Sequence, residues 1–382
     1  MPDLPAGEPK QDQAIARTIG QWFTANAREL PWRTAPRDPW ISLMSEIMLQ
    51  QTQVARVAER FDAFVERFPT PAAMASRPLD DVLSLWSGLG YYRRARMLHA
   101  CAEAIVERHG GAVPDDAAEL HDLPGVGRYT AGAVASIAFG KPEPLVDGNV
   151  SRVLLRLHGV ELAADSKGVQ AWAWQRATDL ARAAVDVPAY SEGIMELGAT
   201  ICTPRAPMCD LCPVRSACAA RAMDAIDRIP RPKARGERTP LAISAIVVTD
   251  RSGRVLLEQR PSSGLWAGLW QPPCVERSAN SPRSLPKTQD AVGLQEHVEV
   301  VGRPRSFSFA TTHRNVKVRV WRAKTTRPRA VEGWRSDVRD RPTGWFSPAE
   351  IETLGLGSAQ RRMLVSADIA ISAPTTGASR VK

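Results

Sequence analysis

Residues 121–149 read HDLPGVGRYTAGAVASIAFGKPEPLVDGN and decide the fold more than any other stretch. The LPGVG segment predicts a tight turn, because Gly125 and Gly127 tolerate positive φ and allow a ligand to approach the backbone. Small apolar residues then predict a helix, whose free N–H groups and positive dipole end suit an anion. Asp147 follows a proline-rich loop in a short Val-Asp-Gly-Asn turn. The turn alone is equally consistent with an ordinary helical hairpin and a surface aspartate.

The whole run from LPGVG to VDGNV resembles the helix-hairpin-helix DNA glycosylase superfamily. The resemblance implies that Gly125 and Gly127 belong to a hairpin that holds a DNA phosphate. It also implies that Asp147 faces the sugar, where a carboxylate would stabilise an oxocarbenium-like cation or trap it covalently. We expect Asn149 to orient Asp147 or the attacking water.

A second informative segment is SLMSEIMLQQTQ, residues 42–53, which predicts a helix with Glu46 among apolar neighbours. Such surroundings raise the pKa of a carboxyl group, which would let it donate a proton at neutral pH. The alternative is a solvated glutamate on an amphipathic helix. Residues 44–53 closely resemble MutY-type adenine DNA glycosylases. That resemblance implies that Glu46 protonates adenine and that Gln50 and Gln51 enter the duplex where the adenine has left.

Other positions match the same family. Tyr91 of the SGLGYYRR segment is the expected wedge beside the mismatch, and Arg28 and Glu192 match positions that line the adenine pocket. Trp32 and Arg33 belong to the LPWR segment that breaks the first helix. The predicted substrate- and DNA-binding residues are therefore Arg28, Trp32, Arg33, Gln50, Gln51, Tyr91, Gly125, Gly127, Glu192, Thr312 and His313.

One position of the hairpin helix bears on the class of reaction. Glycosylases that also cut the strand carry a lysine there, which forms a Schiff base with the sugar. No lysine occurs between Gly127 and Gly140, and Tyr129 occupies the place. We therefore expect a monofunctional glycosylase without strong AP-lyase activity, with Tyr129 in the catalytic set beside Glu46, Asp147 and Asn149.

Four of the six cysteines lie within seventeen residues, at Cys202, Cys209, Cys212 and Cys218. In an intracellular chain this clustering favours a metal over disulfides, and both zinc and a [4Fe–4S] cluster accept four thiolates. Only one Cys-x-x-Cys pair is present, so spacing alone puts iron–sulfur modestly ahead. The C-x6-C-x2-C-x5-C pattern resembles the cluster of the endonuclease III/MutY branch, which implies a [4Fe–4S] cofactor. The other two thiols, Cys101 and Cys274, are expected to be buried or incidental.

Length and charge predict several domains. We expect a tail at 1–12, a mostly α-helical glycosylase domain at 13–225 with the cluster loop at 202–218, a linker at 226–240, an α+β domain at 241–365 and a disordered tail at 366–382. Residues 1–225 hold 23 Lys+Arg and 27 Asp+Glu (net −4), whereas residues 226–382 hold 27 and 14 (net +13). Bulk charge thus places the polyanion contact in the second half. We follow the motif instead, because local patches and helix N-termini bind phosphates without a basic total.

After residue 240 the pattern changes to strands, at 241–248, 255–257 and 316–321. Residues 264–273, GLWAGLWQPP, resemble the entry to a Nudix domain, but Cys274 stands where the first glutamate of the hydrolase motif belongs, and the later Arg-Glu-x-x-Glu-Glu set that binds metal is absent. This argues against a nucleotide hydrolase. The resemblance to MutY proteins implies that this Nudix-like module recognises 8-oxoguanine on the opposite strand. In the family a Phe-Ser-His loop reads this lesion, and here it aligns with Thr311, Thr312 and His313, so the aromatic is missing. Phe307 or Phe309 would replace it if the register differed.

Together these features predict an adenine DNA glycosylase of base excision repair that acts on adenine opposite 8-oxoguanine or guanine in duplex DNA. Base flipping, protonation by Glu46 and an oxocarbenium ion facing Asp147 would carry the reaction. We expect the protein to lie in the cytoplasm of a bacterial-type cell, near the nucleoid, because the sequence shows neither a signal peptide nor a membrane-spanning stretch. We also expect it to be a monomer. The rivals are an endonuclease III-like or thymine glycosylase, a mismatch-binding protein without catalysis, and a nucleotide-pool hydrolase.

Overall fold

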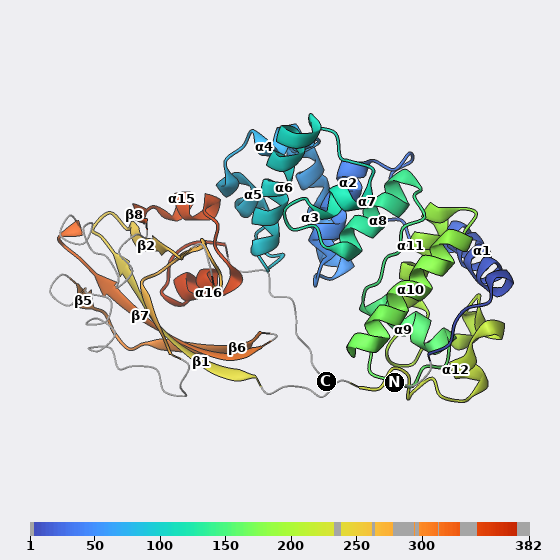
Figure 1. Ribbon diagram of the computed structural model, residues 1–382. Helices are drawn as coiled ribbons and strands as arrows, with labels where there is room; N and C mark the ends of the chain where they lie inside the picture. Colours follow the sequence, from blue (N-terminus) through green and yellow to red (C-terminus); the bar gives the residue numbers. More distant parts are fainter. Residues whose placement is uncertain are drawn as a thin grey trace. The chain divides into compact units, whose positions relative to one another are not determined.

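The computed structural model describes residues 4–232, 238–261, 264–277, 294, 298–311, 313–328 and 342–372. The chain forms two compact units, one made of Met1–Ser76 with Met97–Arg235 and the other of Arg77–Arg96 with Gly236–Lys382 (Figure 1). The segment Arg77–Arg96 lies inside the predicted glycosylase domain by sequence, yet it clusters with the second unit. Within the described residues, no helix is long and apolar enough to cross a membrane.

The first unit is helical, as the sequence predicted. Some of its helices begin or end with ordinary capping devices: Asp38 accepts a hydrogen bond from the Ile41 N–H at 3.0 Å at the start of α2, and Gly140 closes α8 with φ of 67°. The helices are α1 (Pro9–Asn26), α2 (Pro39–Leu49), α3 (Val54–Arg67), α4 (Pro71–Ala75), α6 (Arg93–His109), α7 (Ala117–His121), α8 (Arg128–Phe139), α9 (Gly148–Leu157), α10 (Lys167–Ala183), α11 (Val187–Thr200) and α12 (Ala219–Ala222).

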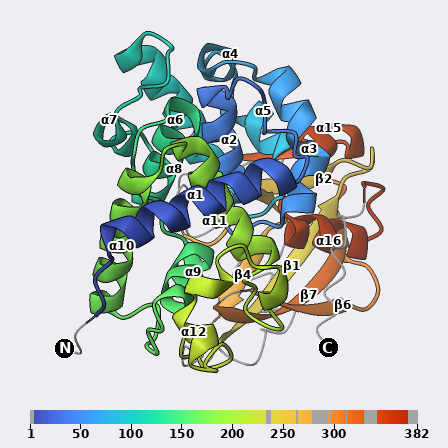
Figure 2. The same ribbon diagram turned by 90° about the vertical axis from the view of Figure 1, so that its right-hand side faces the viewer.

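The start of α1 differs from the expectation of a disordered tail at 1–12. The helix begins at Pro9, and Asp12 is buried in its first turn. The Asp12 carboxylate accepts hydrogen bonds from two nitrogens of the buried Arg176 guanidinium, at 2.5 and 3.1 Å. Because a buried charge is stable only when paired, this ion pair fixes residues 9–12 on α10. Figure 2 shows α1 lying across α10 and α11, against which it packs.

The predicted hairpin is formed by α7, the turn at 122–127 and α8. Gly125 has φ of 77°, and a Cβ there would lie 2.4 Å from the Cβ of Met97, so both conformation and space demand glycine. Gly127 differs from the expectation of positive φ: at −89° it is the N-cap residue of α8. Gly132 allows α8 to approach the following loop, because a Cβ there would lie 1.9 Å from the carbonyl oxygen of Pro144. The turn thus packs closely on α6 at Gly125, and α8 packs closely on the loop before Asp147 at Gly132.

The second unit is built on an eight-stranded mixed sheet in the order β3-β2-β1-β7-β5, with β4 beside β1, β6 beside β7 and β8 beside β2. Its long central strands β1 and β7 run parallel, from Thr239 opposite Arg314 to Thr249 opposite Lys324. Its elements are α5 (Leu79–Leu85), β1 (Thr239–Thr249), β2 (Val255–Gln259), β3 (Trp270–Gln271), β4 (Cys274–Arg277), β5 (Glu299–Val300), β6 (Arg305–Ala310), β7 (Arg314–Lys324), β8 (Thr343–Phe346), α15 (Pro348–Thr353) and α16 (Ser358–Ser366).

The sheet buries apolar residues on both faces, which explains the continuous hydrophobic run of β1. One face packs with α15 and α16 and includes Ile243 and Val318, whereas Ile246 and Val248 belong to a smaller cluster on the other face. The three strands predicted from the sequence and the α+β class are confirmed.

Two segments that the sequence placed outside the domains are packed against them. Ile229, inside the predicted linker, is buried in the first unit, where its carbonyl accepts a hydrogen bond from Arg156 Nε at 2.8 Å. Beyond α16, Asp368 forms ion pairs with Arg305 at 2.6 Å and Arg322 at 2.5 Å. The described chain up to residue 372 therefore packs on the sheet, although the sequence suggested a disordered tail from 366.

Candidate functional site

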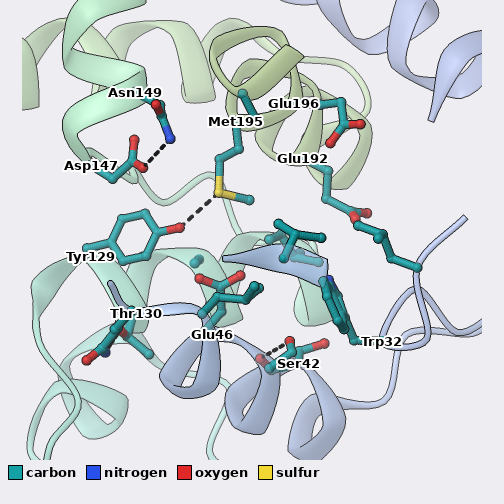
Figure 3. Close-up of a pocket in the computed structure, with 18 of the residues that line it drawn as sticks. Trp32, Ser42, Glu46, Tyr129, Thr130, Asp147, Asn149, Glu192, Met195 and Glu196 are labelled. Atoms are coloured by element: carbon teal, nitrogen blue, oxygen red, sulfur yellow. Dashed lines mark hydrogen bonds between the residues drawn. The ribbon is translucent and has the colours of Figure 1, made fainter. Parts of the chain in front are cut away.

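The first unit contains a cavity of about 750 Å³ enclosed by α2, α8, the start of α9, α11 and the 28–37 segment. Figure 3 shows Glu46, Tyr129, Asp147 and Glu192 around it. Segments far apart in sequence thus meet at one place. The predicted site residues that line the cavity are Arg28, Trp32, Arg33, Glu46, Gln50, Gln51, Gly125, Gly127, Tyr129, Asp147, Asn149 and Glu192.

Glu46 lies on the buried face of α2, with 8% of its surface exposed. Burial raises the pKa of Glu46 to about 7, and the carboxylates of Asp147 and Glu192 act in the same direction, whereas Tyr129 and Arg33 oppose them. A carboxyl group with this pKa is half protonated at neutral pH. It can therefore donate a proton to a base in the cavity without an external acid.

Asp147 is the N-cap residue of α9. One oxygen accepts a hydrogen bond from the Val150 N–H at 2.7 Å, and the other accepts one from Asn149 Nδ2 at 3.1 Å. The carboxylate is thus held in place by two hydrogen-bond donors at the start of a helix. Figure 3 shows Asp147 and Asn149 on the same side of the cavity, apart from Glu46. The site presents a fixed anion and a proton donor from different walls.

Tyr129 lies between these two carboxyl groups. Its hydroxyl donates to the sulfur of Met195 at 3.0 Å, and it is close enough to Glu46 to affect the pKa of that group. Gln50 follows α2 and donates from Nε2 to Thr130 Oγ1 at 3.2 Å, whereas Gln51 is exposed and has φ of 55°. The strained, exposed glutamine stands at the rim of the cavity.

A charged wall borders the cavity beside Glu46. Glu192 accepts hydrogen bonds from Arg33 Nε at 3.0 Å and from Arg37 Nη2 at 2.5 Å. One helical turn later, Glu196 accepts from Arg28 and Arg33. These side chains are partly or fully buried, and each carboxylate is paired with arginines, as buried charges require.

The four clustered cysteines lie after α11. Cys202 follows that helix, Cys209 begins the 3-10 turn η1 (Cys209–Leu211), Cys212 follows it, and Cys218 caps α12. All four are free thiols, and the buried Arg156 donates to the Cys202 sulfur at 3.5 Å and to the next carbonyl at 2.7 Å. Four soft thiolates in one loop are a donor set that suits iron–sulfur chemistry. Within the described residues, no three His, Cys, Asp or Glu side chains form a group for a single metal ion.

The remaining predicted residues lie in the second unit. Tyr91 belongs to the Arg77–Arg96 segment, has φ of 48° and is half exposed, and it is not among the cavity-lining residues. His313 is exposed at the turn between β6 and β7, where its carbonyl accepts a hydrogen bond from the Thr239 N–H at 3.0 Å. Thr312 lies outside the described residues.

The two phenylalanines that could have replaced the missing loop aromatic lie on β6. Phe307 and Phe309 stack with ring centroids 6.2 Å apart and pack on the core of the second unit. They are therefore not available in the turn. Cys274 begins β4, where its sulfur accepts a hydrogen bond from Gln271 at 3.1 Å, and Cys101 is fully buried, with its pKa raised to about 12 by burial.

Sequence reasoning missed several residues of the site. Arg152 donates from Nη2 to Asn149 Oδ1 at 2.9 Å and from Nε to the Cys202 carbonyl at 2.8 Å, so it joins the Asp147 turn to the cysteine loop. Arg37 and Glu196 complete the charged wall. The available signal was the pattern of α9, where arginines occur among apolar residues, because buried arginines require fixed partners.

Two family models match the chain. The model for the HhH-GPD superfamily of base excision DNA repair proteins matches residues 44–177, and a NUDIX domain model matches residues 244–366. Among solved structures, a thermostable thymine-DNA glycosylase is 28% identical with a TM-score of 0.50, over 56% of this chain and 98% of that one. The helical architecture of the first unit is thus that of a known glycosylase.

Curated relatives extend the likeness. The adenine DNA glycosylase of Rattus norvegicus is 38% identical over 316 residues, which are 69% of this chain and 60% of that protein. The chain therefore spans less than two thirds of that relative's length. The adenine DNA glycosylase of Buchnera aphidicola subsp. Baizongia pistaciae is 32% identical over 255 residues, which are 66% of this chain and 72% of that protein. The chain belongs to the adenine DNA glycosylase family.

Proposed function

We propose that the chain removes adenine from duplex DNA by cleaving its N-glycosidic bond. The observation that carries this proposal is the buried Glu46, with a pKa of about 7, in a cavity that also holds the fixed carboxylate of Asp147. Departure of adenine requires a proton on the base and a counter-charge for the sugar cation. These two carboxyl groups supply one each.

In the proposed reaction the adenine leaves the base stack and enters the cavity. Glu46 donates its proton to a ring nitrogen, which makes the base a better leaving group. The C–N bond then breaks, and the electron pair remains on the base. Asp147 stabilises the resulting cation, while Asn149 keeps its carboxylate in place. Water adds to the sugar, its spare proton passes to the Glu46 carboxylate, and an abasic site remains.

We propose that the enzyme is monofunctional. In the described part of the chain no lysine lines the cavity. Lys141, the first lysine after α8, is half exposed and paired with Asp115 at 2.8 Å. Without an amine to form a Schiff base, strand cleavage at the abasic site should need added alkali.

We propose that the opposite base is 8-oxoguanine or guanine and that the second unit reads it. His313 is exposed and available for such contact, but the loop aromatic is absent, since position 311 is threonine and Phe307 and Phe309 pack against the core from β6. The preference for 8-oxoguanine over guanine should therefore be modest. The charge of +13 on residues 226–382 favours a polyanionic partner.

The cysteine loop would hold a [4Fe–4S] cluster through Cys202, Cys209, Cys212 and Cys218. When bound, such a cluster supplies structural cross-linking of a loop that contains little regular structure. We further propose that the enzyme acts as a monomer on DNA in the cytoplasm of a bacterial-type cell.

The test is strand breakage on end-labelled duplexes with adenine opposite 8-oxoguanine, guanine or thymine, and with thymine opposite guanine, before and after alkali. Breaks only at adenine mispairs, and only after alkali, are expected. Breaks without alkali would contradict the monofunctional assignment. Cleavage at thymine opposite guanine instead of adenine would favour the thymine glycosylase reading.

A further inference from the structure

Glu196 lies four residues after Glu192 on α11, so both carboxylates face the same side of the helix. Figure 3 shows them together on the charged wall. Glu192 lines the part of the wall nearer to Glu46, to whose pKa it contributes. Like charges at this spacing repel one another. Something must therefore hold both carboxylates in position beside the cavity.

Glu196 is the more deeply placed of the two, with 3% of its side chain exposed. It accepts three hydrogen bonds from guanidinium nitrogens: Arg28 Nε at 2.5 Å, Arg28 Nη2 at 2.9 Å and Arg33 Nη2 at 2.9 Å. The contact with Arg28 is a two-bond fork, which fixes the plane of the guanidinium as well as its distance. Burial alone would raise the pKa of Glu196, but the bonds from the two arginines outweigh it and lower the pKa.

Arg33 connects the two carboxylates. Its Nη2 bonds to Glu196, its Nε bonds to Glu192 at 3.0 Å, and its Nη1 donates to the carbonyl oxygen of Arg28 at 2.8 Å. Each of its three nitrogens is thus occupied. Loss of the Glu196 contact would release one side of this guanidinium. Glu192 Oε1 would then have a mobile partner, while Arg37 would still hold Oε2.

We infer that Glu196 is a positioning residue for base release: it holds Arg28 and Arg33 so that Arg33 fixes the Glu192 carboxylate at the cavity wall. The inference rests on the proposed function. Glu196 itself takes no part in proton transfer; it keeps the charged wall that faces the base in a single arrangement. A preorganised wall matters because displacements of about 1 Å at an active site reduce rates strongly.

The arrangement also has an electrostatic consequence for Glu46. The charged and titratable groups that face Glu46 are Tyr129 from α8, Asp147 before α9, Glu192 from α11 and Arg33 from the segment after α1. Arg33 lowers the pKa of Glu46, and Glu196 balances part of its charge. Without Glu196 that balance is lost, so the pKa of Glu46 should fall. Because protonated Glu46 is the active form, the basic limb of the rate profile should move to lower pH.

The experiment measures single-turnover adenine release against pH for the full-length wild type, Glu196→Gln and Glu196→Asp. The matched control is Glu161→Gln, which also removes a carboxylate paired with two arginines, Arg228 and Arg231, but at the surface. We expect Glu196→Gln to lower the rate at pH 7 by roughly 10- to 100-fold. Its basic limb should move down by roughly half a pH unit. Glu196→Asp should keep the wild-type limb, and Glu161→Gln should match the wild type.

Several results would overturn the inference. A wild-type rate in Glu196→Gln would do so, and so would a loss of rate without movement of the limb, since that is the signature of a structural ion pair. If Glu196→Gln does not fold, Arg28→Lys tests the same fork at a side chain that is 40% exposed. A wild-type rate in Arg28→Lys would also refute it. If the wild type itself releases no adenine, the proposed function fails and the inference falls with it.

Discussion

Glu46→Gln should stabilise the protein at alkaline pH while it abolishes base release. The pKa of the Glu46 carboxyl is about 7 in the folded chain, against an ordinary value of 4.5. Below pH 4.5 the group is protonated in both folded and unfolded chains. As the pH rises from 4.5 to 7 only the unfolded chain ionises, so folding stability falls, and above pH 7 the loss is complete.

The size of this loss of stability follows from the difference of about 2.5 between the pKa of Glu46 in the folded and in the unfolded chain, because each pKa unit corresponds to about 1.36 kcal/mol. The titration of Glu46 therefore lowers the free energy of unfolding by about 3 kcal/mol at pH 8, but by less than about 1 kcal/mol at pH 5. Glutamine has the same shape and cannot ionise. The gain in the free energy of unfolding of Glu46→Gln should thus be larger at pH 8 by about 2–3 kcal/mol.

Urea unfolding at pH 5 and pH 8, followed by tryptophan fluorescence, measures this difference in the full-length chain. The control is Glu59→Gln, an exposed glutamate on α3, whose effect should not depend on pH. The second unit is the same in the wild type and the variants, so its contribution to the free energy of unfolding cancels in the comparison. An equal gain at both pH values, or a loss at pH 8, would refute the assignment of Glu46 as a buried carboxyl that titrates near neutrality.

Three further predictions concern other parts of the site. Tyr129→Phe removes a group that lowers the pKa of Glu46, so the basic limb of the pH–rate profile for adenine release should move to higher pH. Single-turnover rates measured across a pH series test this, and movement of the limb to lower pH would contradict it. Gly132→Ala places a Cβ 1.9 Å from the Pro144 oxygen and should reduce the free energy of unfolding by about 2–3 kcal/mol, measured in urea. The control Gly127→Ala meets open space and should cost less than about 1 kcal/mol. Cys212→Ser should lower the iron content per chain and the thermal midpoint together, and an unchanged iron-to-protein ratio would exclude the proposed ligand set.

Much of the candidate site could be predicted from the sequence, because its residues occur in contiguous motifs. Glu46 stands among apolar residues with helical spacing, which predicts burial and hence a raised pKa. Asp147 precedes Gly-Asn-Val at the start of a helix, a position where a carboxylate caps the backbone. The fold class followed from the same signals, since the period of the hydrophobic pattern changes from helix to strand near residue 240.

The charged wall could not be predicted in full. Spacing shows that Glu192 and Glu196 share one face of α11, but it does not show which arginines meet them, because Arg28 and Arg33 approach from a segment about 160 residues earlier. The early start of α1 was missed for a similar reason. Its first turn is polar and gives no hydrophobic signal, and only the distant Arg176 explains why Asp12 is buried.

The central claim is tested most directly by identifying the free base released in a single turnover. A duplex with one adenine opposite 8-oxoguanine is incubated with excess wild type, Glu46→Gln or Asp147→Asn, and the small-molecule fraction is analysed by chromatography and mass. We expect stoichiometric free adenine from the wild type and rates lower by roughly a thousandfold in both variants. Adenine release at the wild-type rate from either variant, or none from the wild type, would contradict the account.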